Sequence, residues 1–222
     1  MIDWRTEAEK FGKLFVVENI SKQIQDEQYE VIYNLCQKAA VPNMSAVEIG
    51  CWTGCASSII AECVSRVNGI LFCVDWFKGI PNHQLEEVAS RNNIQALHRQ
   101  NVTEVGYYKW VNVLPMSSEE AVKTFQDNSI DFLFIDGDHK YEKVKQDINL
   151  WYPKVKKGGW LTGHDCEIHL LPHINIDHYL TLGDDSLYIE EVQTWAHVGV
   201  VKAVGERFHE VNITNGIWSV KK

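Results

Sequence analysis

Apolar residues recur along the chain with two spacings that alternate, one helical and one strand-like. Residues 25–39 carry apolar side chains at helical spacing, and residues 46–50 then form a short apolar run. A tight turn over residues 50–54 leads into a second helical pattern at residues 56–67. This order predicts a helix that precedes a first strand–turn–helix unit.

The same alternation continues after this unit. Residues 69–75 are almost continuously apolar and end in an acid, Asp75, as is typical of a parallel strand buried on both faces. The next predicted elements are a helix around 84–97, a strand at 111–114, a helix from about Ser117, a strand at 130–136, a helix at 141–151 and a strand at 158–163. Strands that alternate with helices predict a parallel sheet.

The last part of the chain changes character. No spacing dominates over residues 166–197, a segment too long for a simple crossover, and we interpret it as a lid over the site. A helix is expected at 198–208, followed by strands at 211–214 and 217–220 that Asn215-Gly216 joins in a hairpin. The predicted fold is therefore α/β and Rossmann-like, with a doubly wound, mostly parallel sheet that ends in an antiparallel C-terminal hairpin.

Length and charge narrow the class of protein. The 222 residues fit one domain, residues 1–222, with residues 1–44 as a helical lead-in. The net charge of −9 disfavours binding to nucleic-acid phosphates. No run approaches the ~20 apolar residues of a membrane span, and no leader segment is recognisable, so a cytoplasmic location is expected. Whether the chain forms a homo-oligomer stays open.

Six cysteines lie mostly within apolar runs and lack the paired spacing of zinc sites. We therefore expect reduced thiols in the core.

The first turn indicates what kind of ligand the crevice takes. Residues 48–54 read EIGCWTG, and the bulky Trp52 stands where a dinucleotide fingerprint needs its second glycine to approach a pyrophosphate. A cofactor without phosphate needs no such approach. Asp75, 21 residues beyond Gly54, is placed to accept hydrogen bonds from the ribose of a nucleoside cofactor.

Three segments together resemble a known family. Residues 47–54 (VEIGCWTG), 132–141 (FLFIDGDHKY) and 158–165 (GGWLTGHD) are similar to the class I S-adenosylmethionine-dependent methyltransferases. More narrowly, they resemble the branch of the macrocin-type O-methyltransferases. The resemblance covers residues 46–165.

The resemblance assigns cofactor residues. It implies that Glu48, Gly50 and Gly54 surround the methionine end of S-adenosylmethionine and that Asp75 binds the ribose. It places Ser117 near the adenine, whereas the residue pattern alone also allows Ser117 to cap the following helix. Asp136 is expected to contribute to the cofactor site as well.

The resemblance also assigns the chemistry. Adjacent parallel strands bring together Asp136 and His139 from one strand end and His164 and Asp165 from the next. His139, with Asp136 as a second catalytic residue, corresponds to the general base, and Asp136 and Asp165 correspond to ligands of Mg²⁺ or another divalent metal. His164 stands where several relatives have a carboxylate. It is therefore either a further metal ligand or a hydrogen-bond partner of Asp165.

The expected function is methyl transfer from S-adenosylmethionine to a hydroxyl group of a small-molecule acceptor, such as a sugar or another natural product. The alternatives are C- or N-methylation without metal, a nicotinamide-dependent oxidoreductase, and a non-catalytic nucleoside-binding domain. No chemical role is assigned to the lid histidines, which are His169, His173, His178 and His197.

Overall fold

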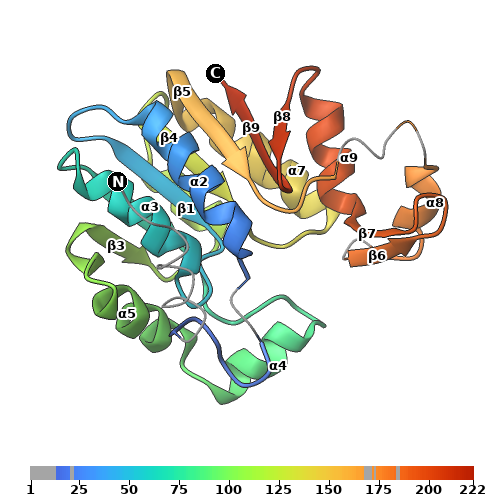
Figure 1. Ribbon diagram of the computed structural model, residues 1–222, viewed down its shortest axis with the longest axis horizontal. Coiled ribbons are helices and arrows are strands. Elements are labelled where there is room, and N and C mark those ends of the chain that lie inside the picture. Colours follow the sequence, from blue (N-terminus) through green and yellow to red (C-terminus); the bar gives the residue numbers. More distant parts are fainter. Residues whose placement is uncertain (1–13, 21–22, 168–171, 173, 184–185) are drawn as a thin grey trace.

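The computed structural model describes residues 14–20, 23–167, 172, 174–183 and 186–222, and within them a seven-stranded sheet with strand order β3-β2-β1-β4-β5-β9-β8 (Figure 1). The strands are β1 (Ser45–Ile49), β2 (Ile70–Val74), β3 (Val111–Leu114), β4 (Ile130–Ile135), β5 (Val155–Gly163), β8 (Asn212–Thr214) and β9 (Ile217–Lys221). The first five pair in parallel, and β9 and β8 are antiparallel. The predicted fold class is confirmed.

Helices cover both faces of the sheet, and β4 contributes buried apolar side chains to each face. Phe132 and Phe134 are buried in a cluster with α2 (Asp26–Ala39) and α3 (Cys55–Ser65). Leu133 and Ile135 are buried in a second cluster with α7 (Tyr141–Trp151) and α9 (Val198–Arg207). A strand buried on both faces has the nearly continuous apolar sequence that predicted it.

One predicted helix is two helices. The pattern at 84–97 corresponds to α4 (Gln84–Arg91) and α5 (Ile94–Glu104), and the chain breaks between them at Asn92 and Asn93. The Asn93 side chain accepts a hydrogen bond from the N–H of Ala96, which starts α5 afresh. The prediction of a single helix was wrong because helical apolar spacing resumes directly after the cap, at Ile94 and Leu97.

The segment predicted as a lid has secondary structure of its own. It contains α8 (Ile176–Leu180) and an antiparallel pair, β6 (Ser186–Ile189) and β7 (Thr194–His197), which lie beside α9 (Figure 1). Residues 168–171, 173 and 184–185, and with them His169 and His173, lie outside the described residues. Residues 1–13 and 21–22 of the predicted lead-in do as well.

The register of the sheet positions the site. Ile49 pairs with Val74 and with Ile135, which in turn pairs with Gly163. The residues that follow these four strands therefore meet at one edge, the carboxyl edge, where doubly wound folds bind ligands.

Two further expectations concern the chain as a whole. All six cysteines are buried and unbridged, as predicted. Within the described residues, no helix is both long and apolar enough to cross a bilayer.

Candidate active site

A cleft of about 280 Å³ opens at the carboxyl edge of the sheet. Its lining includes most of the residues that the sequence singled out: Glu48, Gly50, Asp75, Ser117, Asp136, His139, His164 and Asp165. Gly54 is not among the residues that line it.

Gly50 allows two strand ends to approach each other closely. Its φ is +81°, and a Cβ atom there would lie 2.0 Å from the backbone oxygen of Asp136. The backbone N–H of Gly50 donates to Val74 O, and the N–H of Asp136 donates to Ile49 O. A side chain at residue 50 would therefore force apart the two loops that form the floor of the cleft.

Gly54 has a packing role. It begins α3 with φ +94°, and a Cβ atom there would lie 2.8 Å from Cγ2 of Val102 and 3.0 Å from Cδ2 of His98, both on α5. The role at the methionine end that the resemblance implies for Gly54 stays a prediction.

Asp75 holds the turn in place. One of its carboxylate oxygens, Oδ2, accepts the backbone N–H groups of Cys51 and Trp52, and Oδ1 accepts that of Phe77. Burial raises the pKa of Asp75, and these three hydrogen bonds oppose the rise. A carboxylate has about four lone-pair sites, so capacity remains for a ligand hydroxyl.

Glu48 lies at the floor of the cleft and is almost fully buried. The Ser57 hydroxyl donates to its Oε2, and Oγ of Ser57 also lies 3.0 Å from Nε2 of His98. Burial, with a contribution from Asp136, raises the pKa of Glu48 to about 8, and burial lowers that of His98 to about 4. Burial thus disfavours the charged form of both groups.

Ser117 caps a helix. Its side chain accepts the N–H of Glu120 and the Glu120 side chain accepts the N–H of Ser117, which is a capping box at the start of α6 (Ser118–Ala121). The capping interpretation is confirmed, and the residue also lines the cleft. Next to it, Ser118 donates to the buried Asp147 and accepts from Nε1 of Trp151.

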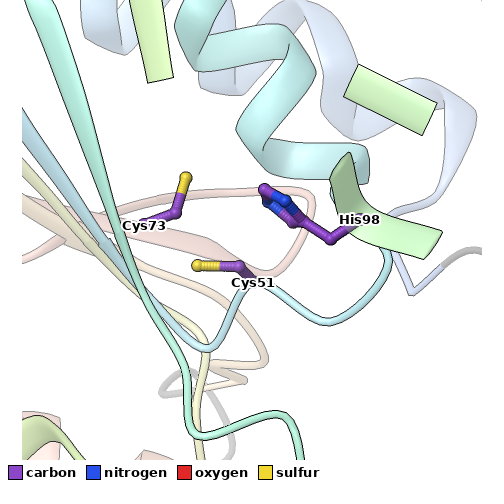
Figure 2. Close-up of side chains that lie close together, drawn as sticks. All are labelled: Cys51, Cys73 and His98. Carbon is purple, nitrogen blue, oxygen red and sulfur yellow. The ribbon is translucent and has the colours of Figure 1, made fainter. Parts of the chain in front are cut away.

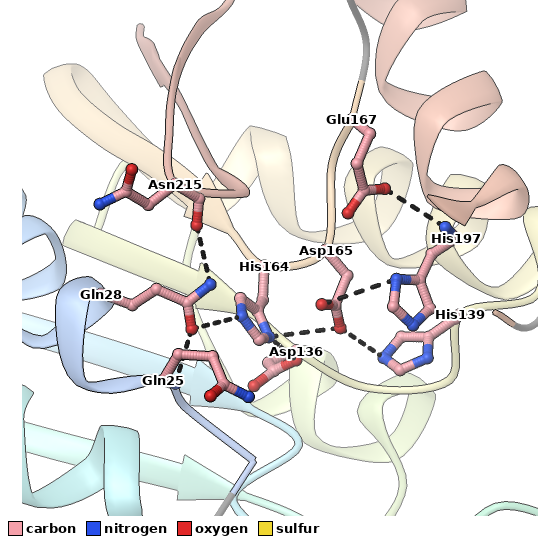
Figure 3. A network of polar contacts seen from close by, with 9 residues as sticks. All are labelled: Gln25, Gln28, Asp136, His139, His164, Asp165, Glu167, His197 and Asn215. Carbon is pink, nitrogen blue, oxygen red and sulfur yellow. Dashed lines mark hydrogen bonds and ion pairs between the residues drawn. The ribbon is translucent and has the colours of Figure 1, made fainter. Parts of the chain in front are cut away.

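His164 is held by hydrogen bonds on both ring nitrogens (Figure 3). Gln28 donates through Nε2 to Asn215 O and accepts the Gln25 N–H at Oε1, so its Oε1 is fixed as an acceptor. Nε2 of His164, 3.0 Å from that oxygen, must therefore carry a proton.

The other ring nitrogen faces two carboxylates. Nδ1 of His164 lies 3.3 Å from Oδ1 of Asp136 and 3.2 Å from Oδ2 of Asp165, so it also donates. Burial acts to lower the pKa of His164, but Asp165 and Asp136 raise it well above its ordinary value. The ring is an imidazolium between two carboxylates.

Asp165 is the centre of a histidine cluster. Its Oδ2 lies 3.2 Å from Nε2 of His139, and its Oδ1 lies 3.6 Å from Nδ1 of His197. Burial acts to raise the pKa of Asp165, but His164, with His139 and His197, holds it well below its usual range. Asp165 thus remains a carboxylate that orients the imidazole of His139.

His197 was not predicted as a functional residue. Its ring lies 4.6 Å from that of His139, centroid to centroid, and its backbone N–H donates to Glu167. Gly199 makes this approach possible, because a Cβ there would lie 2.2 Å from His139 O. No sequence spacing could have indicated it, since tertiary packing, including that of β7 against α9, brings His197 to the site.

A family model that describes a methyltransferase domain matches residues 47–166, which include the first turn, Asp75 and the whole Asp136–His139–Asp165 group. The chain belongs to the methyltransferase-domain family. The match begins after Gln28 and ends before His197, so these two residues of the methyltransferase lie outside the matched region.

One relative matches much of the chain. The methyltransferase is 28% identical over 157 residues to an uncharacterized protein of Acanthamoeba polyphaga mimivirus, a match covering 69% of this chain and 65% of that protein. It thus spans about two thirds of this relative's length.

Two solved structures share the fold. One is an O-methyltransferase from Bacillus cereus in complex with SAH (TM-score 0.61, 14% identity, 100% of this chain and 92% of that one). The other is the SAH-bound Podospora anserina methyltransferase PaMTH1 (TM-score 0.62, 13% identity, 100% and 88%).

Proposed function

We propose that this methyltransferase uses S-adenosylmethionine to methylate a hydroxyl oxygen of a small-molecule acceptor. The observation that carries the proposal is the His139–Asp165 pair, which opens into the same cleft as the turn after β1. The SAH-bound structures of the same fold support the choice of cofactor. The net charge of −9 favours an acceptor other than a nucleic acid.

The turn suits a cofactor without phosphate. Trp52 lines the cleft beside Gly50, at the turn position where a dinucleotide fingerprint has the glycine that lets backbone approach a pyrophosphate. In the proposal Gly50 and Glu48 border the methionine end, Asp75 receives a ribose hydroxyl, and Ser117 lies toward the adenine. Asp136 borders the sulfonium side.

His139 is proposed as the general base. The acceptor hydroxyl gives its proton to the His139 imidazole as its oxygen bonds to the methyl carbon and the sulfonium leaves as a thioether. Asp165, held as a carboxylate, stabilises the imidazolium that forms. In this arrangement Asp136 shapes the site next to His139 rather than taking the proton.

A divalent cation such as Mg²⁺ is a second part of the proposal. Asp136 and Asp165 supply the oxygen ligands that Mg²⁺ prefers, and ligand atoms of these residues and His164 lie within 4.8 Å of one another. When bound, the ion would lower the pKa of the acceptor hydroxyl. His164 fits this set only without its Nδ1 proton, so the carboxylates fit better than the ring does.

The His164 network favours a metal-free variant of the same reaction. A protonated His164 between Asp136 and Asp165 already neutralises part of their charge, as a cation would. In that variant His139 alone activates the acceptor, and carbon or nitrogen acceptors become as suitable as oxygen.

The test is transfer of a labelled methyl group from S-adenosylmethionine to panels of hydroxylated sugars, phenols and amines. Each panel is run with Mg²⁺, with a chelator, and with Mg²⁺ restored after the chelator. If oxygen is labelled, the chelator abolishes the labelling and Mg²⁺ restores it, the result supports both O-methylation and the divalent cation. Chelator-resistant transfer supports the metal-free variant, and no transfer to any panel contradicts the O-methylation proposal.

A further inference from the structure

A second group of ligand-type side chains lies beneath the cleft, apart from the proposed catalytic residues. Cys51 comes from the turn after β1, Cys73 from β2 and His98 from α5, and the three side chains converge (Figure 2). All three are buried, with exposed fractions of 3%, 0% and 0%. We propose that Cys51, Cys73 and His98 bind a thiophilic divalent cation, Zn²⁺ first of all.

The distances fit a tetrahedral site after a small contraction. One donor atom of each residue lies within 4.8 Å of the other two. Zinc bonds of about 2.3 Å to sulfur and about 2.0 Å to nitrogen place tetrahedral ligands roughly 3.5 to 3.8 Å apart. The donors therefore need to move together by about 1 Å, which side-chain rotation provides.

His98 presents a nitrogen that nothing else uses. Ser57 donates its hydroxyl proton to Glu48, so the contact of Ser57 with Nε2 of His98 uses the ring N–H. The proton of the neutral ring is then on Nε2, and Nδ1 has a lone pair. Nδ1 is buried and has no hydrogen-bond partner within the part of the chain that the structure describes. A buried polar atom without a partner is costly, and a metal ion bound at Nδ1 would satisfy it.

The surroundings supply charge balance and a route of entry. Two thiols lose their protons to solvent as two sulfur–zinc bonds form, so the divalent charge is neutralised without any change of oxidation state. Oε2 of Glu48 lies 3.6 Å from Sγ of Cys73 and accepts the Ser57 hydroxyl, so it borders the site without belonging to the set of three. Cys51 and Glu48 both line the cleft, through which the ion reaches the site.

The thiols of Cys51 and Cys73 have only weak competing contacts. Sγ of Cys51 lies 3.7 Å from Glu48 O and 3.6 Å from Val74 O, and Sγ of Cys73 lies 3.5 Å from the Ser57 hydroxyl. Thiols are weak hydrogen-bond donors, so a metal–sulfur bond replaces little. The pairwise sequence spacing typical of zinc sites is missing because each ligand belongs to a different element.

Cobalt titration of the reduced, metal-free full chain tests the proposal. We expect one equivalent of Co²⁺ per chain to produce thiolate-to-cobalt charge-transfer absorption and the visible bands of a tetrahedral site, and Zn²⁺ to abolish both. Cys73→Ala and His98→Ala should weaken Co²⁺ binding at least ~10-fold, as expected when a direct or supporting ligand is lost. Cys36→Ala, which removes an equally buried thiol from α2, should leave the spectrum unchanged.

Zn²⁺ should also raise the thermal midpoint of the wild-type chain and of Cys36→Ala, but not that of Cys73→Ala. The wild-type titration decides the matter even if a variant does not fold. An absence of thiolate absorption in the wild type overturns the proposal, as does a folded Cys73→Ala variant with an unchanged spectrum. Neither measurement uses methyl transfer, so the outcome is independent of the proposed function.

Discussion

Nε2 of His139 lies 3.2 Å from Oδ2 of Asp165, across the carboxyl ends of the adjacent strands β4 and β5. The pair has the arrangement of a general base and its orienting carboxylate. Because Asp165 also contacts His164 and His197, its charge is fixed by several partners and not by His139 alone. The proposed chemistry depends on this pair more than on any other contact in the cleft.

His139→Ala should lower kcat by ~10²–10⁴-fold, the usual contribution of a general base, and leave S-adenosylhomocysteine affinity nearly unchanged. Rate measurements with a saturating acceptor, combined with calorimetry, separate the two effects. His178→Ala is the matched control, since His178 is an exposed histidine on α8 and should keep full activity. Loss of cofactor binding with an unchanged kcat would contradict the role assigned to His139.

Asp75→Asn should act on cofactor binding first. The amide has one acceptor oxygen in place of two, so its NH₂ group must face backbone N–H groups that Asp75 now accepts. We expect the dissociation constant for S-adenosylhomocysteine to rise ~10-fold or more. A larger effect on kcat than on binding, at saturating cofactor, would argue against the ribose role.

Gly50→Ala and Gly106→Ala form a matched pair for the close approach at the cleft floor. Both glycines have positive φ, +81° and +94°, so each substitution should cost about 1–2 kcal/mol of stability from backbone strain. Only at Gly50 does the new Cβ meet backbone, at 2.0 Å, whereas nothing lies within 4 Å at Gly106. Urea unfolding should therefore show a larger decrease in the free energy of unfolding for Gly50→Ala than for Gly106→Ala. Gly50→Ala should also lose cofactor binding. Equal decreases in the free energy of unfolding would contradict the close approach at the cleft floor.

Asp147→Asn should stabilise the protein in a pH-dependent way. Burial raises the pKa of Asp147 from 3.8 to about 6, so the folded state holds this proton more tightly than the unfolded state. The associated stability is present below pH 4 and is lost as pH rises through about 6, by up to roughly 3 kcal/mol. The uncharged amide of Asp147→Asn avoids this loss of stability, and its oxygen still accepts the hydrogen bond from the Ser118 hydroxyl.

Urea unfolding at pH 4 and pH 7 checks this. The free energy of unfolding of Asp147→Asn should exceed that of the wild type at pH 7 and match it near pH 4. A difference that does not change between the two pH values would contradict the explanation.

The sequence predicted the parallel sheet because its strands are buried on both faces. The run at Ile130–Ile135 is apolar except for Asp131, and Asn215-Gly216 marked the final hairpin. The break between α4 and α5 was missed because Asn93 caps a new helix directly after the first, and the apolar spacing resumes at Ile94.

The site was predicted where strand register alone brings residues together, and missed where tertiary packing does so. Asp136, His139, His164 and Asp165 follow adjacent strands, and all line the cleft. Gln28, His98 and His197 reach their partners from helices and the lid segment, at sequence separations for which a single sequence holds no signal. Gln28 in particular fixes the protonation of His164, which residue type alone leaves open.

Calorimetry of the purified full chain with S-adenosylhomocysteine and, separately, with NAD⁺ tests the central claim most directly. We predict one S-adenosylhomocysteine bound per chain, weakened by Asp75→Asn, and no heat of binding for NAD⁺. Binding of NAD⁺ in its place, or no binding of either ligand by the folded chain, would contradict the assignment of a phosphate-free cofactor to the cleft.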